Sequence, residues 1–375
     1  MRPVEEYRTV VAALVPAART VTVAPSEALG RALARDVAAP LSLPPFTNSA
    51  MDGYAVRAED AVAGATLSVA EDIPAGRTTV PPLAPGTAHR IMTGAPVPDG
   101  ADAIVPVENT DAGTTRVRID LAPEPGRFFR HAGSDIAAGE TALAAGEVAG
   151  PAAVGLAAAL GITELEVLAP LRVLVLSTGS ELVAPGEPLE PGQIYESNAP
   201  MLAAALTEAG GIGLLVTTGG VSAGAYEVVK DAFTGRGLEF TKVAMQPGMP
   251  QGCGTVDLGG ASVPVVAFPG NPVSALVSFE VFLRPALRAA MGLPADRPRR
   301  RARLTAPLDS VPGKRQFQRG LLIREPNGTD SVSVLGGPGS HYLRWLSKAD
   351  CLLDIPPEVQ HLAAGDPVDV IDLNH

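Results

Sequence analysis

The sequence predicts a multidomain chain that combines α/β and β architecture: a helical region, a β-rich domain, a three-layer doubly wound α/β domain and a C-terminal β domain. Three observations favour this class. The chain has 375 residues, more than one hydrophobic core normally supports. Its middle part, 171–293, alternates fully apolar strands with helical periods, which is typical of a parallel sheet covered on both faces. Both flanking parts break into short apolar runs between glycine and proline turns.

Two proline-led segments open the chain. Pro3 precedes VEEYRTVVAALV and Pro25 precedes SEALGRALARDV, and both predict helices, because proline fits the first turn and acidic side chains suit the positive end of the helix dipole. From residue 40 to about 146 the pattern changes to short strands such as ATLSVA, AIVPVE and TRVRIDL. A third helix is predicted from Pro151 onward.

The doubly wound domain is predicted from four apolar strands and three helices. The strands RVLVLS, GLLVTT, EFTKVAM and PVVAFPG alternate with helices near NAPMLAAALTEAG, AYEVVKDAFTGRG and PVSALVSFEVFLRPALRAAMG. The charged run 296–303 is interpreted as a solvated linker rather than an anion patch. The strands beyond it predict a small β-barrel or sandwich.

Composition excludes several classes of function. The formal charge of −11 and the pI near 5.0 argue against a nucleic-acid partner, which needs a positive field. Two cysteines and five histidines without ligand spacing argue against a disulfide framework or a zinc cluster, so we expect a reducing, cytoplasmic compartment. No export signal is apparent, and the most apolar run, 148–163, is shorter than a membrane span.

Three loops follow strands of the predicted sheet, and ligands of doubly wound sheets bind at these ends. They are 177–182, 217–227 and 268–274. In the third, Asn271 is the expected N-cap and Pro272 the first helical residue, which suits an oxyanion above Gly270. In the second, glycines allow the backbone to approach a ligand closely. A strand-to-helix turn can be only a turn, but three such loops with hydroxyls and carboxylates favour a site.

Carboxylates in two of these loops favour a magnesium site. Glu181 and Glu227 are hard oxygen ligands, and magnesium takes one or two carboxylates together with substrate phosphates. For either residue alone, a helix N-terminal charge or a surface ion pair is the favoured interpretation, and a polyphosphate-like substrate would explain both. Asp52 and Thr93 of the β-rich part would add a carboxylate and a hydroxyl, or would only shape turns.

Seven motifs, in this order, resemble the MoeA family, the molybdopterin molybdenumtransferases related to the C-terminal part of gephyrin. They are PPFTNSAMDGYAV, IMTGAPVPDGADAIVPVENT, GSDIAAGE, VLSTGSELV, GQIYESNAPML, GGVSAG and FPGNPVSALVSFEVF. The resemblance implies an elongated homodimer whose cleft lies between the doubly wound domain and the β-rich domain of the partner subunit. It implies four parts: a helical linker and dimerisation region (1–39 and 138–168), a β-rich domain (40–137), a doubly wound molybdopterin-binding domain like that of molybdopterin adenylyltransferases (169–296) and a C-terminal β-barrel (297–375).

The resemblance also implies a reaction and a set of residues. The reaction is magnesium-dependent insertion of molybdate into adenylylated molybdopterin, with release of AMP, and the molybdopterin adenylyltransferase is a candidate partner. The pterin dithiolene supplies the sulfurs for the metal, so no cysteine cluster is needed. The implied catalytic residues are Asp52, Thr93, Asp135, Glu181 and Glu227, of which Asp52, Glu181 and Glu227 would hold magnesium. The implied cofactor-binding residues are Ser177, Thr178, Gly179, Gly219, Gly220, Ser222, Gly248, Pro269, Gly270, Asn271, Pro272, Ser274, Arg315 and Ser340.

One segment departs from the family pattern. Where the family commonly has KPGKP, this chain has QPGMP, with Gln246 and Met249 in place of two lysines. Two cations are thereby lost from an expected oxyanion site, so either Arg315 or another cation replaces them, or the chain handles a different step or metal. Lys314, Arg315 and Arg319 would add contacts from the last domain or form a strand-pairing ion network. Two other functions stay open: the adenylyltransferase step, and a non-catalytic cofactor carrier or scaffold.

Overall fold

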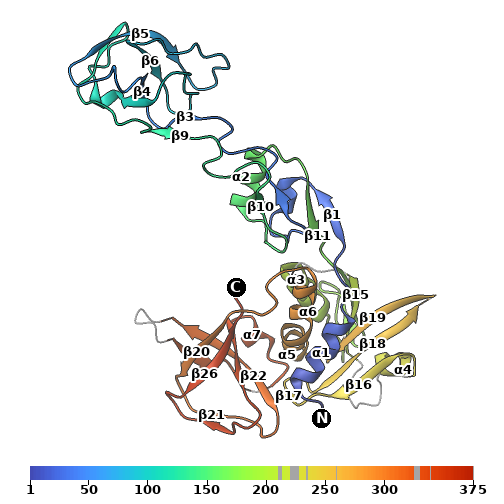
Figure 1. Ribbon diagram of the computed structural model, residues 1–375. Coiled ribbons are helices and arrows are strands. Elements are labelled where there is room, and N and C mark those ends of the chain that lie inside the picture. Colours follow the sequence, from blue (N-terminus) through green and yellow to red (C-terminus); the bar gives the residue numbers. More distant parts are fainter. Residues whose placement is uncertain are drawn as a thin grey trace. The chain divides into compact units, whose positions relative to one another are not determined.

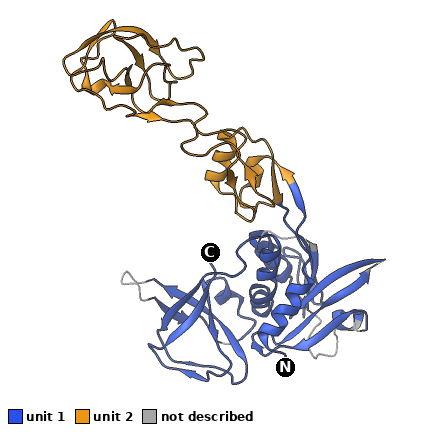
Figure 2. Cartoon of the chain, in the orientation of Figure 1, with its two compact units in different colours: residues 1–21, 168–375 blue, residues 22–167 orange. Residues whose placement is uncertain are grey.

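The computed structural model describes residues 1–209, 213–219, 228–233, 235–258, 260–324, 330–337 and 339–374. Among these, the chain forms two compact units, one of residues 1–21 and 168–375 and the other of residues 22–167 (Figure 2). The boundary falls within two strands that pair with each other, β1 (Thr20–Val23) and β11 (Leu165–Leu168). The division of the chain into four parts stays a prediction.

The unit 22–167 contains a five-stranded sheet in the order β7-β4-β6-β5-β8. Three of its strands, β4, β5 and β6, are labelled in Figure 1. Two smaller pairs, β3–β9 and β10–β2, accompany it. The strands of the sheet are β4 (Gly53–Val56), β5 (Thr66–Ile73), β6 (Thr87–Ile91), β7 (Ala103–Pro106) and β8 (Arg116–Arg118). The remaining elements are η1 (Pro25–Ala28), β2 (Val37–Ala38), β3 (Asn48–Ser49), η2 (Val107–Asn109), β9 (Phe129–Arg130), β10 (Thr141–Leu143) and α2 (Pro151–Ala159).

This sheet is buried on both faces. Along β4, Tyr54 and Val56 join one apolar cluster while Ala55 joins a second cluster on the other face, as the two-residue period of a strand requires. Gly53 starts the strand where a Cβ atom would lie 2.0 Å from the carbonyl oxygen of Val105, so no larger residue fits. The close approach of β4 to β7 therefore requires the glycine that directly follows Asp52.

One predicted helix is wrong in extent. The segment after Pro25 forms only the single 3-10 turn η1, which ends at Ala28. Beyond it, Gly30 adopts a φ of +76°, and the backbone then bonds to residues 147 and 149. These tertiary hydrogen bonds replace the helical ones, because a short isolated helix gains little from propensity alone. The helix predicted at Pro151 is confirmed as α2.

The unit formed by 1–21 and 168–375 contains a five-stranded sheet in the order β12-β15-β19-β18-β16. Its strands are β12 (Arg172–Ser177), β15 (Gly213–Thr218), β16 (Leu238–Lys242), β18 (Pro250–Leu258) and β19 (Ala261–Phe268). The first three in spatial order are parallel, but β18 runs antiparallel to both of its neighbours. The sequence analysis missed β18, since its glycines mask a strand pattern. Its connection to β19 is too short for a parallel crossover.

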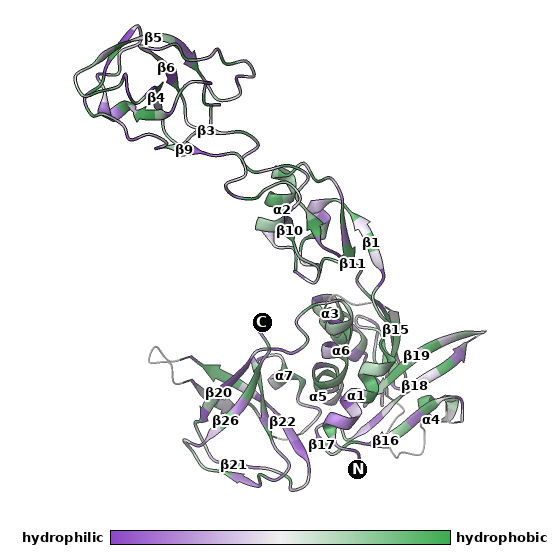
Figure 3. Cartoon of the chain, in the orientation of Figure 1, coloured by the Kyte–Doolittle hydropathy of each residue, from purple (hydrophilic) through white to green (hydrophobic). Residues whose placement is uncertain are grey.

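Helices cover both faces of this sheet. Leu214 and Val216 of β15 pack with one cluster of helices, while Leu215 between them packs with Val229 on the opposite face. The first cluster comprises α1 (Val4–Leu14), α3 (Asn198–Ala209), α5 (Pro272–Ser278), the π-helical η3 (Phe279–Leu283) and α6 (Arg284–Ala290). The opposite face carries α4 (Val228–Phe233). The central strands β15 and β19 are correspondingly apolar in Figure 3.

The C-terminal strands of the same unit close into a barrel. The order is β22-β23-β20-β26-β24, and β24 also pairs with β22, which closes the ring. Its elements are β20 (Arg299–Leu304), β22 (Arg315–Ile323), β23 (Ser331–Val334), α7 (Leu343–Leu346), β24 (Cys351–Ile355) and β26 (Pro367–Asp372), with the small pair β21 (Leu308–Asp309) and β25 (His361–Leu362) beside it. None of the helices in the described part of the chain has the length and apolar character to cross a membrane.

Two short pairings lie outside the five-stranded sheet, and one of them reaches the barrel. Strand β17 (Met245–Gln246) runs parallel to the start of β22, with Met245 opposite Arg315. A second small ladder joins β13 (Leu182–Val183) to β14 (Ile194–Tyr195) beyond the end of β12. Both pairings lie next to the carboxyl ends of the parallel strands, so they shape the space above the sheet.

Candidate functional site

A cleft of about 840 Å³ lies at the carboxyl ends of the parallel strands. It is lined by segments from the sheet, from the helices and from the barrel, which all belong to one unit. These segments are 178–182, 194–198, 218–219, 245–250, 269–272, 274, 314 and 340–341. The described parts of all three loops that the sequence analysis singled out contribute to this one cleft.

The three loops approach each other through their backbones. Gly219 has a φ of +90°, and a Cβ atom there would lie 2.5 Å from the carbonyl oxygen of Thr178. A Cβ atom on Gly270 would lie 3.3 Å from the Cα atom of Gly219. The amide of Gly219 also donates to the carbonyl oxygen of Phe268, at 3.2 Å. Glycine at these two positions therefore lets the ends of β12, β15 and β19 converge.

Two hydroxyl groups at the start of the first loop form hydrogen bonds with Thr218 of the neighbouring strand. Ser177 Oγ and Thr218 Oγ1 lie 2.8 Å apart, so the two hydroxyls share a hydrogen bond between neighbouring strands. Thr178 Oγ1 donates to the carbonyl oxygen of Thr218, at 3.3 Å. Thr178 and Gly179 line the cleft, whereas Ser177 does not. Ser177, which was predicted to bind the cofactor, therefore lies outside the cleft lining.

The third loop joins the start of α5 to the barrel. Asn271 occupies the N-cap position and Pro272 the first helical position, as predicted. The Asn271 side chain does not cap the helix; its Nδ2 atom donates to Ser340 Oγ, at 2.8 Å. The amide of Val273 donates to the carbonyl oxygen of Ser340, at 3.2 Å. Residues that are far apart in the sequence, Asn271 and Ser340, are thereby brought together at one edge of the cleft.

The segment 246–249 forms another wall. Gly248 adopts a φ of +97°, and its carbonyl oxygen accepts a bond of 2.7 Å from Gln251 Nε2. The same nitrogen lies 2.6 Å from Ser278 Oγ, and both side chains are buried. This buried contact holds the segment against α5, so Gln246 and Met249 line the cleft from a fixed backbone.

Two carboxylates line the cleft. Glu181 is exposed, and its carboxylate has no hydrogen-bond or ion-pair partner within the described part of the chain. Glu196 instead caps α3, because its Oε1 atom accepts bonds from the amides of Asn198, at 2.6 Å, and Ala199, at 3.0 Å. Glu181 is therefore the carboxylate that stays available to a ligand.

Asn198 is a cleft residue that the sequence analysis did not select. It is 9% exposed, and its Nδ2 atom donates to the carbonyl oxygen of Gly270, at 2.6 Å. Its Oδ1 atom is buried without a partner among the described residues. The motif GQIYESNAPML contained the signal, since an acid two residues before a helix predicts a cap and places the next side chains at the sheet end.

The unit 22–167 carries three predicted residues. Asp52 Oδ1 accepts a bond of 2.6 Å from the amide of Thr93, and both residues are exposed. This bond from the Thr93 backbone holds the pKa of Asp52 below its ordinary value, because it stabilises the carboxylate. Asp135 is also exposed, and its amide donates to the carbonyl oxygen of Leu43, at 2.9 Å. Asp52 therefore does shape a turn, and its carboxylate lies at an exposed position.

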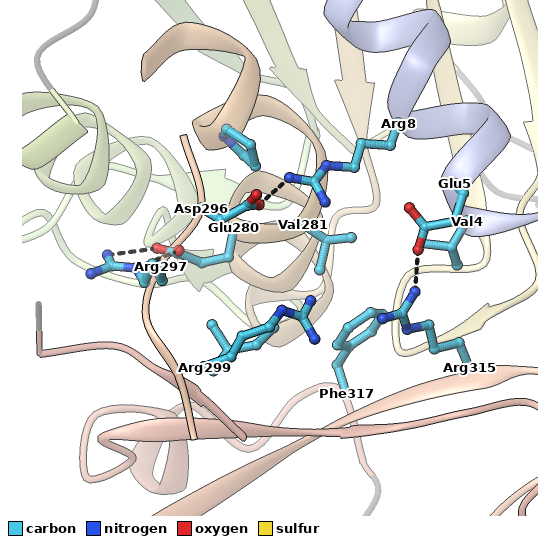
Figure 4. A pocket seen from close by; sticks show the side chains of 12 residues that line it. Val4, Glu5, Arg8, Glu280, Val281, Asp296, Arg297, Arg299, Arg315 and Phe317 are labelled. Carbon is cyan, nitrogen blue, oxygen red and sulfur yellow. Dashed lines mark hydrogen bonds and ion pairs between the residues drawn. The ribbon is translucent and has the colours of Figure 1, made fainter. Parts of the chain in front are cut away.

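Arg315 lies away from the cleft, in a smaller cavity between α1, η3 and the barrel (Figure 4). Its guanidinium donates two bonds to the buried carboxylate of Asp354, at 2.6 and 2.7 Å, and also pairs with Glu5. These hydrogen bonds to Asp354 raise the pKa of Arg315 well above its ordinary value. Arg315 was predicted to bind the cofactor, but its guanidinium forms ion pairs with Asp354 and Glu5 and does not line the cleft.

Three predicted residues, Gly220, Ser222 and Glu227, lie outside the described residues. Within the described ranges, no group of three or more histidine, cysteine, aspartate or glutamate side chains is arranged to hold a metal ion. The predicted magnesium ligands thus comprise Glu181 in the cleft, Asp52 in the other unit and one residue that the structure does not describe.

Sequence and structure comparisons identify relatives along the whole chain. Residues 2–161 match the MoeA N-terminal region (domains I and II), residues 211–289 a probable molybdopterin binding domain, and residues 301–373 the MoeA C-terminal region (domain IV). Molybdopterin molybdenumtransferase 2 of Mycobacterium tuberculosis is 55% identical, with 100% of both chains covered. Molybdopterin molybdenumtransferase 1 of that organism is 37% identical, covering 99% of this chain and 98% of the relative.

A solved structure supports the same relationship. The crystal structure of the molybdopterin biosynthesis MoeA protein from Pyrococcus horikosii superimposes with a TM-score of 0.83 at 30% identity, covering 99% of this chain and 98% of that chain. The predicted fold class is therefore confirmed.

Proposed function

Because the chain belongs to the MoeA family, which acts in molybdenum cofactor biosynthesis, we propose that it inserts molybdate into adenylylated molybdopterin and releases AMP. It is a transferase of this pathway. The observation that carries the proposal is the cleft itself. It joins the probable molybdopterin binding domain to the MoeA C-terminal region, and its volume lies within the range of small-molecule sites.

The cleft residues suit a substrate with phosphate and oxyanion groups. Thr178, Asn271 and Ser340 place hydroxyl and amide groups along the walls, and the backbones of Gly219 and Gly270 are bare of side chains. Bound between these walls, the dithiolene and molybdate would be held in reacting position, which is how such a site accelerates a transfer. The sulfurs that receive the metal belong to the substrate, so buried Cys253 and Cys351 have no part in the reaction.

Magnesium is part of this proposal. The carboxylate of Glu181 is exposed in the cleft and uncommitted within the described part of the chain, and it stands among hydroxyl groups, which fits a hard cation. Bound there with substrate phosphates, magnesium would neutralise charge on the phosphoanhydride. Glu181 would hold the ion directly or through water.

A homodimer is also part of this proposal, and Asp52 and Thr93 would act at the cleft of the other subunit. The support is the exposed Asp52–Thr93 pair, together with family membership. Asp135 would assist from the same unit. Sedimentation of the purified protein measures the dimer directly.

The test is single-turnover AMP release. Purified protein is mixed with adenylylated molybdopterin, and AMP is measured with and without molybdate and magnesium. We expect release that requires both, and a strong loss in Glu181→Gln. Tight pterin binding without release would instead support a cofactor carrier, a function that the neutral residues Gln246 and Met249 favour. Formation of adenylylated pterin from molybdopterin and ATP would support the adenylyltransferase step.

A further inference from the structure

A second cavity, of about 330 Å³, lies at the C-terminal barrel beside the cleft, and we call it the barrel cavity. It is bounded by the paired strands β17 and β22, by β23 and by the segment 305–311 that follows β20. Its lining residues belong to one unit, and the structure describes all of them. Gln246 lines both the barrel cavity and the cleft, so the two spaces share one residue of their walls.

Three glutamine side chains form a row along one side of the barrel cavity. Gln246 lies opposite Gln316 in the parallel ladder of β17 and β22, and Gln318 follows two residues later on the same face of β22. Gln316 is 2% exposed, and the other two are half-buried. The same face of β22 continues with Leu322, which packs in the barrel core. At this end of the strand, amides therefore replace apolar groups on the inward face.

Two amide groups of this row have no partner among the described residues. Gln318 Nε2 donates to Gln316 Oε1, at 2.8 Å. This bond leaves Gln316 Nε2 as a donor and Gln318 Oε1 as an acceptor, side by side at the cavity wall. An amide that loses water without gaining a partner is costly, so a ligand that fills this space must itself supply an acceptor and a donor.

The rest of the lining limits the chemistry of such a ligand. No lysine or arginine lines the barrel cavity, whose lining is described in full, so an anion would find no counter-charge there. Its one carboxylate, that of Asp309, is exposed and lies 2.7 Å from His361 Nδ1, so a metal ion would meet a single carboxylate that is already paired. Leu308 and Val334 add apolar surface. These features select a neutral ligand with an apolar face and a hydrogen-bonding edge.

We propose that the barrel cavity binds the pterin ring of the substrate by its amino-oxo edge. This inference rests on the proposed function and adds the place of one part of the substrate. A pterin carries an exocyclic oxygen beside a ring N–H group, so Gln316 Nε2 would donate to the oxygen and Gln318 Oε1 would accept from the N–H. The volume is near the lower end for small-molecule sites, so it suits one ring system, while the larger cleft takes the remaining groups.

The first experiment is calorimetric titration of the full-length protein with hydroxymethylpterin at neutral pH. Wild type is compared with Gln316→Met, Gln318→Met and the control Gln360→Met, which changes an exposed glutamine of the same unit outside the cavity lining. We expect the Kd to rise about 3- to 10-fold in each of the first two variants, as for loss of one hydrogen bond, and to stay unchanged in the control. Urea unfolding followed by Trp345 fluorescence checks that each variant is folded.

The second experiment tests the hydrogen-bonding edge. In diaminopteridine an amino donor replaces the exocyclic oxygen of the pterin, so it would face the donor Nε2 of Gln316. We expect wild type to bind diaminopteridine about 10-fold more weakly than hydroxymethylpterin, and Gln316→Met to lose most of this preference, which a merely structural role would not change. In the AMP-release assay, Gln316→Met should raise the KM for adenylylated molybdopterin more than it lowers kcat.

A third variant blocks the space without touching the glutamines. Ala306 is an exposed residue of the cavity lining, so Ala306→Phe adds bulk where the fold tolerates substitution. We expect it to weaken binding of hydroxymethylpterin and of diaminopteridine alike. Adenosine serves as a comparison probe, because adenine also presents a donor beside an acceptor, and we expect the three variants to leave its binding unchanged.

The outcomes separate this inference from the proposed function. If the three variants bind hydroxymethylpterin as wild type does, or if wild type does not bind it, the ring lies elsewhere and the inference is overturned. If the variants lose affinity for adenosine instead, the cavity takes the nucleobase and the assignment to the pterin is overturned. In each case, molybdate-dependent AMP release by wild type would leave the proposed function standing. If wild type shows no such release, the proposed function falls, and with it the role of the pterin as a substrate.

Discussion

Replacing Gly219 by alanine tests whether the cleft depends on close backbone approach. Gly219 has a φ of +90°, and an added Cβ atom would lie 2.5 Å from the carbonyl oxygen of Thr178. Gly260 offers a matched control, because its φ is +89° and nothing lies within 4 Å of its added Cβ atom. The two substitutions therefore share the backbone strain and differ in the collision.

The magnitudes follow from this difference. A side chain in the left-handed region lowers the free energy of unfolding by about 1–2 kcal/mol, and this applies to both variants. Overpacking adds a further destabilisation of about 1–3 kcal/mol. We expect it only in Gly219→Ala, because the added Cβ atom forces the first two loops apart. We expect the free energy of unfolding to fall by about 2–5 kcal/mol in Gly219→Ala and by about 1–2 kcal/mol in Gly260→Ala.

Urea unfolding provides the measurement. The chain has one tryptophan, Trp345, which lies in the same unit as both glycines, so its fluorescence reports on that unit. Molybdate-dependent AMP release should fall strongly in Gly219→Ala and persist in Gly260→Ala. Equal losses of stability, or a fully active Gly219→Ala, would refute the reasoning from close approach.

Two further predictions concern charged groups. The Thr93 amide resonance should titrate with Asp52 at a midpoint below the ordinary aspartate pKa of about 3.9, and Asp52→Asn should abolish this titration. Because this pKa is lowered, the hydrogen bond contributes its full stability above about pH 3.9, and this contribution is lost as the pH falls through the folded-state pKa. A titration midpoint of the Thr93 amide at or above about pH 3.9 would contradict the structure. Arg297→Met should cost about 3–5 kcal/mol, since it strips the bonds of 2.7 and 3.0 Å from buried Glu280. Exposed Arg301 has no ion-pair partner in the described ranges, so Arg301→Met should change stability by less than about 0.5 kcal/mol, and equal effects would count against the argument.

The local pattern of the chain predicted much of the structure. Apolar strands, the proline that starts α5 and the turn glycines depend on short-range preferences, and the three loops after β12, β15 and β19 converge as the topology of a doubly wound sheet requires. The same approach failed where tertiary contacts override propensity. The segment after Pro25 forms one 3-10 turn, and the glycine-rich strand β18 joins the sheet in the antiparallel sense.

Amino-acid order alone determined which fold class this chain adopts, which motifs it carries and which acids and glycines stand at the strand ends. Only the tertiary structure decided which of three nearby cations faces the cleft. Asp354 is buried and needs a counter-charge, and Arg315 forms an ion pair with it. Arg319 donates to a backbone carbonyl oxygen next to Ser340. Lys314 is left at the cleft because burying an unpaired charge costs far more than leaving it beside solvent, and that balance depends on neighbours distant in the sequence.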